Sequence, residues 1–69
     1  MQISARNQFA GHVKEVKLGN IMAEVVGNIG GGHEVVAAVT HGSAERLGLT
    51  QGSVVTVVIK ATEVMIAKD

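Results

Sequence analysis

Apolar and polar residues alternate along the first part of the chain, which is the pattern of a strand with one buried face. Between Ile3 and Val13 the apolar residues Ile3, Ala5, Phe9 and Val13 fall on odd-numbered positions, and successive side chains of a strand point to opposite faces. After Glu15 the apolar residues change to the even positions Val16 and Leu18. We expect a β-bulge there, because one extra residue re-aims a strand, as barrels require at their corners.

Two more alternating segments predict a second and a third strand. The tripeptide Leu18-Gly19-Asn20 indicates a tight hairpin turn, because Gly and Asn tolerate positive φ. Alternation resumes from Ile21 to Ile29 and again from Glu34 to Thr40. Between them, Gly30-Gly31-Gly32 is expected to be the tip of a hairpin. A phosphate-cradling loop is disfavoured, since neither a helix start nor a Lys-Ser/Thr pair follows the glycines.

The last third of the chain predicts a short helix and two strands. Residues Ser43 to Gly48 offer an N-cap serine and a C′ glycine, which predict a helix of one or two turns that begins at Ser43. Ser53 to Lys60 is a nearly continuous β-branched run, consistent with a strand covered on both faces. Thr62 to Ala67 is expected to form a turn and a short strand.

The predicted fold class is therefore all-β. We expect a small five-stranded OB-like barrel with one short helix between the third and fourth strands, as a single domain over residues 1–69. Periodicity alone fits other small β-barrels equally well.

Composition restricts the partners and the compartment. A chain of 69 residues without cysteine has too small a core for wide stability and no disulfide to reinforce it, so self-association is expected. Six Lys and Arg balance six Asp and Glu, and Phe9 is the one aromatic residue, which argues against nucleic acid and anionic membranes as partners. Because no apolar run reaches the length of a signal peptide or a membrane span, a cytoplasmic location is expected.

Neither catalysis nor a metal site is predicted. No nucleophile, base and orienting acid form a recognisable set. The three histidines, His12, His33 and His41, lack the spacing of metal ligands. His41 could change a neighbouring site with pH, although an exposed loop histidine is the simpler interpretation.

Three segments in one register resemble the molbindins, which are stand-alone molybdate-binding domains of the Mop/TOBE type. The segments are Ser4 to Gln8, Thr40 with Ser43, and Lys60 to Ile66, and the similarity runs from about Met1 to Ala67. The resemblance implies an OB-like barrel and a homohexamer built as a trimer of dimers. It also implies that molybdate or tungstate is bound for storage, buffering or homeostasis, without catalysis and without an organic cofactor.

The resemblance further implies that the oxyanion sites lie at subunit interfaces. By position, one subunit would supply Ser4, Arg6, Lys60 and Ala61, and its neighbour would supply Thr40 and Ser43. Ala61 would contribute only its backbone N–H.

The chemistry of these residues suits a tetrahedral dianion independently of the resemblance. Such a ligand presents only acceptors, so its site needs donors and positive charge. Ser4 and Arg6 are two positions apart on the expected first strand and would share a face. Ser43, at the expected helix start, would add free backbone N–H groups, and Lys60 a compact second charge. An all-donor site also cannot accept the proton that phosphate carries near neutrality.

Other interpretations stay open at this point. Taken singly, Arg6 and Lys60 are more often solvated surface charges, Ser43 an ordinary helix cap and Thr40 an ordinary strand residue. Only their joint pattern favours a site. The alternatives to anion storage are an OB-type nucleic-acid-binding module, which shares the fold, and an anion-sensing regulatory subunit of a molybdate transporter or regulator.

Overall fold

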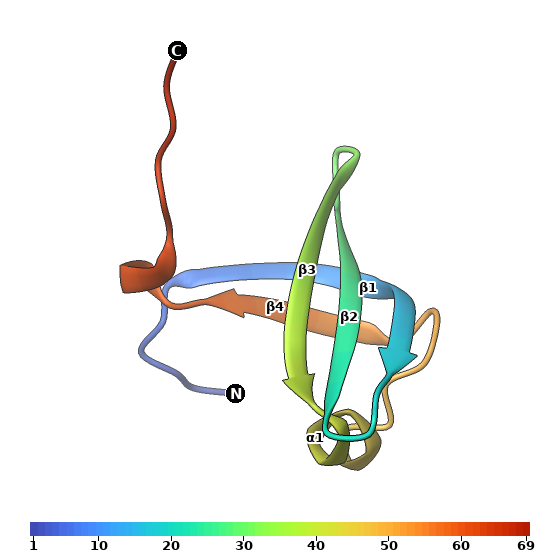
Figure 1. Ribbon diagram of the computed structural model, residues 1–69. Coiled ribbons are helices and arrows are strands. Elements are labelled where there is room, and N and C mark those ends of the chain that lie inside the picture. The colour runs from blue at the N-terminus through green and yellow to red at the C-terminus, as the bar shows by residue number, and fades with distance from the viewer.

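The fold is built on one four-stranded antiparallel sheet in the computed structural model, which describes residues 1–69 (Figure 1). The elements are β1 (Asn7–Leu18), β2 (Met22–Gly30), β3 (His33–Thr40), α1 (His41–Arg46), β4 (Val54–Ile59) and the 3-10 turn η1 (Ala61–Glu63). The strand order in the sheet is β3-β2-β1-β4. None of the helices has the length and apolar character needed to span a membrane.

Strand β1 joins strand β4 on one side of the sheet to the β2–β3 hairpin on the other. Its residues 7–12 pair with β4, and its residues 12–18 pair with β2. The register with β2 shifts between Val13 and Glu15, so a bulge is present within two residues of the predicted position. β1 bends beyond this point, and Figure 1 shows β1 and β4 running across β2 and β3. Because β1 bends at the bulge, its first part can pair with β4 and its second part with β2.

Gly11 permits a close approach between β1 and β2. A Cβ atom at Gly11 would lie 2.2 Å from the backbone oxygen of Asn28, much closer than two non-bonded heavy atoms can approach. A glycine in a strand often marks such a place. The sequence pattern gave no reason to single out this position.

The core of the single chain is small. The buried residues are Val13, Ala23, Val25, Gly27 and Ala44. Larger apolar side chains remain exposed, among them Leu18, Ile21, Val36, Leu47, Val54, Met65 and Ile66. An apolar groove lined in part by Val39, Leu47 and Val57 also opens on this surface. The chain therefore leaves much of its apolar surface in contact with solvent.

The predicted fifth strand and the closed barrel are not formed by the chain. After η1, residues 64–69 extend without a sheet partner, and Met65 and Ile66 are 91% and 90% exposed. Strands β3 and β4 are the two edges, so the sheet is open. A strand forms only where a segment lies beside an edge and exchanges hydrogen bonds with it, and the segment after η1 pairs with neither free edge.

The prediction that the fourth strand is covered on both faces is also wrong for the single chain. Alternate residues of β4 are exposed, and Val54 is 90% exposed. A β-branched run shows that a segment suits a pleated sheet, and it does not by itself show what covers either face.

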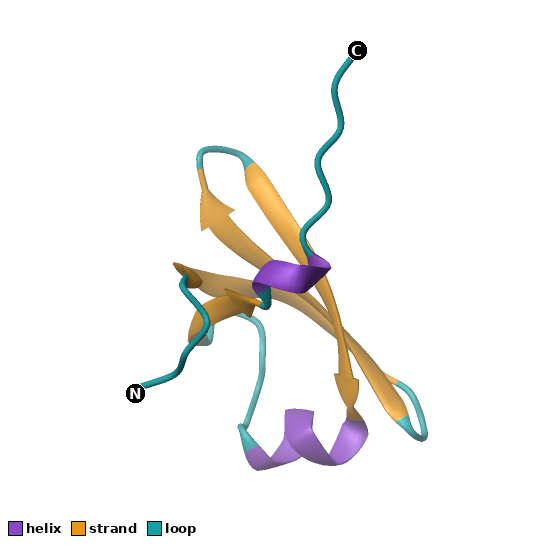
Figure 2. Ribbon diagram, turned by 90° about the vertical axis from the view of Figure 1, so that its left-hand side faces the viewer, coloured by secondary structure: helices purple, strands orange, loops and turns teal.

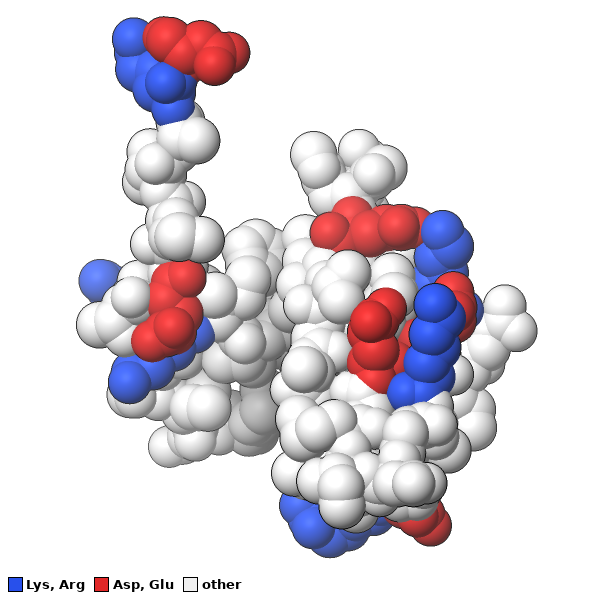
Figure 3. Space-filling view, viewed as in Figure 1, with Lys and Arg blue, Asp and Glu red and all other residues white.

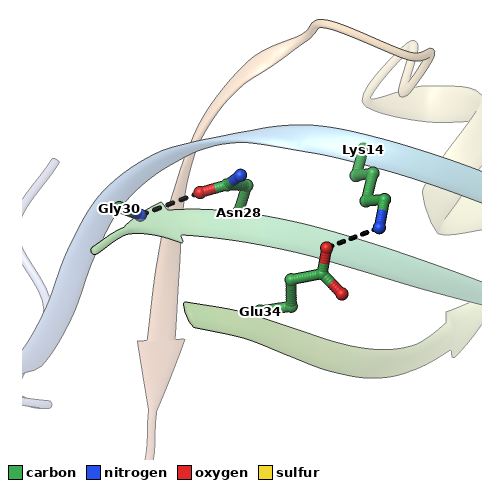
Figure 4. Close-up of polar contacts among 4 residues, drawn as sticks. All are labelled: Lys14, Asn28, Gly30 and Glu34. Atoms are coloured by element: carbon green, nitrogen blue, oxygen red, sulfur yellow. Dashed lines mark hydrogen bonds and ion pairs between the residues drawn. The ribbon is translucent and has the colours of Figure 1, made fainter. Parts of the chain in front are cut away.

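Both predicted hairpins are present, although only one uses positive φ. The turn after β1 is closed by Gly19 N–H, which donates to Met22 O at 2.8 Å, and no residue in that turn has positive φ. In the β2–β3 hairpin, Gly30, Gly31 and Gly32 all have positive φ. There Gly30 N–H also donates to Asn28 Oδ1 at 2.9 Å (Figure 4). The glycine triplet is thus a hairpin tip, as predicted.

Candidate functional site

Four of the predicted site residues lie at one end of the β1–β4 pair. The last paired residues of this ladder are Asn7 and Ile59, so Arg6 and Lys60 leave it as adjacent extensions of paired strands. Ser4 lies two residues before Arg6, and Ala61 begins η1. We call these residues the strand-end cluster, and its members are Ser4, Arg6, Lys60 and Ala61. All four are exposed.

The expectation that Ser4 and Arg6 share the face of a strand is not met. Strand β1 begins at Asn7, and Ser4 lies in a bend. The reason is the length of β4, which ends at Ile59 and leaves residues 3–6 without a partner. Gln8 Nε2 donates to Ala5 O at 2.6 Å and holds this segment against the start of β1.

Thr40 and Ser43 meet at the start of α1. Thr40 Oγ1 accepts the Ser43 backbone N–H at 3.1 Å and donates to Ser43 Oγ at 2.7 Å. Arg46 Nη2 donates to the same Ser43 Oγ at 3.4 Å. We call Thr40, Ser43 and Arg46 the helix cluster. Arg46 was missed from the sequence, although its spacing of three residues from Ser43 on a helix places the two side chains on one face.

The N-cap of α1 is Thr40 and not Ser43. Thr40 has the extended backbone of an N-cap, with φ −70° and ψ 150°, and its hydroxyl reaches the N–H three residues further on. The Ser43 backbone N–H is therefore occupied within the chain. The predicted C′ glycine is confirmed, because Gly48 follows the C-cap Leu47 and has φ +63°.

The two clusters lie at opposite ends of the sheet. The strand-end cluster is at the N-terminal end of β1. The helix cluster follows β3, whose last residue Thr40 pairs with Met22 beside the C-terminal end of β1 (Figures 1 and 2). β1 has 12 residues, which corresponds to roughly 40 Å measured along the bent strand at about 3.3 Å per residue. One chain does not place both clusters around one small ligand.

Most of the cations that have no carboxylate partner lie in the two clusters. Lys14 Nζ lies 2.6 Å from Glu34 Oε2 (Figure 4), and Lys17 Nζ lies 3.5 Å from Glu15 Oε1. The remaining side-chain cations are Arg6, Arg46, Lys60 and Lys68, and none of them forms an ion pair. Lys68 Nζ donates only to the backbone oxygen of its neighbour Asp69, at 3.5 Å. The other three cations belong to the two clusters.

Acidic and basic residues alternate over the face drawn in Figure 3, without an extended patch of one sign. The Glu34 carboxylate is the main reason that the pKa of Lys14 is raised. The face drawn in Figure 3 therefore does not provide the continuous basic groove of a nucleic-acid-binding protein.

His41 connects α1 to the turn between β1 and β2. Its Nδ1 lies 2.6 Å from Gly19 O, its Nε2 pairs with Glu45, and its backbone N–H donates to Ile21 O at 2.8 Å. The hydrogen bond to the Gly19 carbonyl, followed by the Glu45 carboxylate, raises the pKa of His41 above its ordinary value. His41 is therefore a partly buried helix residue and not an exposed loop histidine.

The stabilising contribution of His41 is expected to decrease as the pH rises. Because its pKa is raised in the folded chain, the contribution is fully present below the unfolded-state pKa and is lost through the folded-state pKa. Urea unfolding of wild type and His41→Gln at about pH 5.5 and about pH 8.5 brackets this window. The variant should lose more free energy of unfolding at the lower pH. An equal loss at both values would show that the ring does not titrate in this contact.

Comparison with known proteins gives consistent results. The sequence profile of the TOBE domain family matches residues 3–66. Molybdenum-pterin-binding protein 3 of Clostridium pasteurianum is 50% identical over 66 residues, which is 96% of this chain and 97% of the relative. A molybdate-binding protein from Sporomusa ovata has a TM-score of 0.91 at 43% identity, covering 99% of this chain and 100% of that one. The cytoplasmic molybdate-binding protein ModG, with molybdate bound, has a TM-score of 0.84 at 48% identity over 88% of this chain and 43% of ModG.

Proposed function

Since the chain belongs to the TOBE domain family, we propose that it binds molybdate as an intact oxyanion and carries out no chemistry on it. The observation that carries this proposal is that three of the four cations without an ion pair lie in the two clusters. Arg6, Lys60 and Arg46 have no carboxylate partner, and each lies among hydrogen-bond donors in one of the two clusters. Tungstate has nearly the same size and charge, so it should occupy the same site.

The donors of the strand-end cluster match the needs of a tetrahedral dianion. Arg6 offers a planar fork of N–H groups, Lys60 a compact ammonium, Ser4 a hydroxyl and Ala61 a backbone N–H. A dianion has only acceptor positions, and hydrogen bonds from charged donors are the strongest that it can receive. Ser43 of the helix cluster would add a hydroxyl from the other side.

The site is completed by a second copy of the chain. The strand-end cluster of one copy would face the helix cluster of the next, because the two clusters of a single copy lie apart. A contact between two different surfaces is head-to-tail and closes into a ring when the rotation allows it. The exposed apolar residues, including Val54, Met65 and Ile66, supply surface for such contacts. We propose a homohexamer, built as a trimer of dimers.

Storage or buffering of the anion in the cytoplasm is the role that we propose for this assembly. A chain that binds an oxyanion reversibly between its own copies needs neither a cofactor nor a further partner. An anion-sensing role for a transporter or regulator would use the same site and would differ only in what binds to the loaded assembly. The interspersed charges and the single aromatic residue favour the anion over nucleic acid.

The direct test of function is equilibrium dialysis of the purified protein against molybdate, with bound molybdenum measured by elemental analysis. We expect saturable binding of molybdate that equimolar sulfate and phosphate do not displace. Sulfate is smaller than molybdate and should fit the site less well. Phosphate carries a proton, for which a site made only of donors offers no acceptor. The proposal would be contradicted if molybdate did not bind, or if sulfate at equal concentration displaced it.

A further inference from the structure

We propose that Arg46 is a positioning residue of this site, which holds the Ser43 hydroxyl as a one-way donor and so favours oxyanions that carry no proton. The inference rests on the proposed function and deepens it. It concerns the side chains of the helix cluster and not the N-terminus of α1, whose Ser43 N–H is already capped by Thr40.

The hydrogen bonds of the helix cluster fix what Ser43 can do. A hydroxyl has one proton and two acceptor positions. Ser43 Oγ accepts from Thr40 Oγ1 at 2.7 Å and from Arg46 Nη2 at 3.4 Å, so both acceptor positions are used. The Ser43 hydroxyl proton makes no hydrogen bond within the cluster, so the hydroxyl can donate to a ligand but cannot accept from it. The Thr40 proton is used within the cluster, which makes Thr40 a second positioning residue.

The charge of Arg46 strengthens this arrangement. Arg46 forms no ion pair, so a neighbouring carboxylate does not neutralise its guanidinium. A charged donor to Ser43 Oγ polarises the hydroxyl, and hydrogen bonds in such a chain strengthen one another. Glu45, the adjacent acidic residue of α1, is paired with His41 instead.

Selectivity follows from the direction of the Ser43 proton. A hydroxyl that can rotate is able to accept a hydrogen bond from a protonated ligand as well as donate one to a ligand oxygen. Phosphate carries a proton near neutrality, and molybdate does not. With both acceptor positions of Ser43 filled, a protonated oxyanion finds no acceptor at this point. Its own O–H is left unpaired, which is costly once the second copy covers the site and excludes water.

A double-mutant cycle tests whether Arg46 acts through Ser43. The proteins are wild type, Arg46→Gln, Ser43→Ala and the double variant, each titrated with molybdate by calorimetry. Arg46→Gln should weaken molybdate binding by about tenfold in the wild-type background and should have almost no effect when Ser43 is already alanine. Equal effects in both backgrounds would mean that Arg46 acts directly or at long range, and would overturn the inference.

The second readout is the ratio of the phosphate to the molybdate dissociation constant. This ratio should fall in Arg46→Gln and be partly restored in Arg46→Lys, which keeps a charged donor but not the fork. A purely structural role would weaken both anions equally and leave the ratio unchanged, which would also overturn the inference. If wild type binds no molybdate, the proposed function fails. If wild type binds and the Arg46 variants match it in affinity and ratio, only the inference fails.

Discussion

Replacing Arg6 with alanine is expected to weaken molybdate binding by about 1.5–3 kcal/mol, or roughly tenfold to over a hundredfold, which is the scale of a hydrogen bond from a charged donor. Arg6 extends β1 beside Lys60 at the end of the β1–β4 ladder, and it has no carboxylate that would compete with a ligand. Its guanidinium can donate to two oxygens of the anion at once, which the Lys60 ammonium does less well.

Calorimetric titration with molybdate measures this effect, with two further variants for comparison. Arg6→Lys keeps the charge and loses the fork, so its affinity should lie between those of wild type and Arg6→Ala. Lys17→Ala removes a cation that is paired with Glu15 on the sheet and should leave the affinity unchanged. An Arg6→Ala protein that binds as tightly as wild type would place Arg6 on the solvated surface.

The parts of the fold that depend on local pattern could be predicted from the sequence. Alternation locates β2 and β3, the triplet Gly30-Gly31-Gly32 marks their hairpin, and Gly48 marks the end of α1. Each of these features depends on a backbone conformation or a period that neighbouring residues determine.

The parts that depend on distant partners could not be predicted in the same way. Residues Thr62 to Ala67 suggest a turn and a fifth strand, but strand formation requires pairing along a sheet edge, and this segment pairs with neither free edge. The β-branched run of β4 looked buried on both faces, yet nothing within the chain covers Val54. Both errors concern surfaces that a second copy of the chain could cover.

The same distinction between local sequence pattern and contacts with other residues applies to the candidate site. Its residues were identified by resemblance to a family, and the register of β1 with β4 accounts for the adjacency of Arg6 and Lys60. The cap at Thr40 was assigned to Ser43 because either hydroxyl suits an N-cap, and only the backbone angles decide between them. Arg46 was missed because a cation in the last turn of a short helix is ordinary by itself, and its contact with Ser43 gives it significance.

In the proposed assembly, two copies of the chain hold one molybdate between the strand-end cluster of one and the helix cluster of the other. Two double variants test it. In the first, Arg6→Ala and Lys60→Met together remove the charges of the strand-end cluster. In the second, Thr40→Val and Ser43→Ala together remove the hydroxyls of the helix cluster. Each protein alone should bind molybdate far more weakly than wild type, because every site in it lacks one half.

The deciding measurement is the number of tight molybdate sites after the two double variants are unfolded and refolded together in equal amounts. If the sites are shared between copies, random assembly combines an intact strand-end cluster with an intact helix cluster at about a quarter of the interfaces. We predict that about this fraction of wild-type binding returns, with wild-type affinity, while each variant refolded alone stays weak. A mixture that binds no better than its separate components would contradict a site built from two copies.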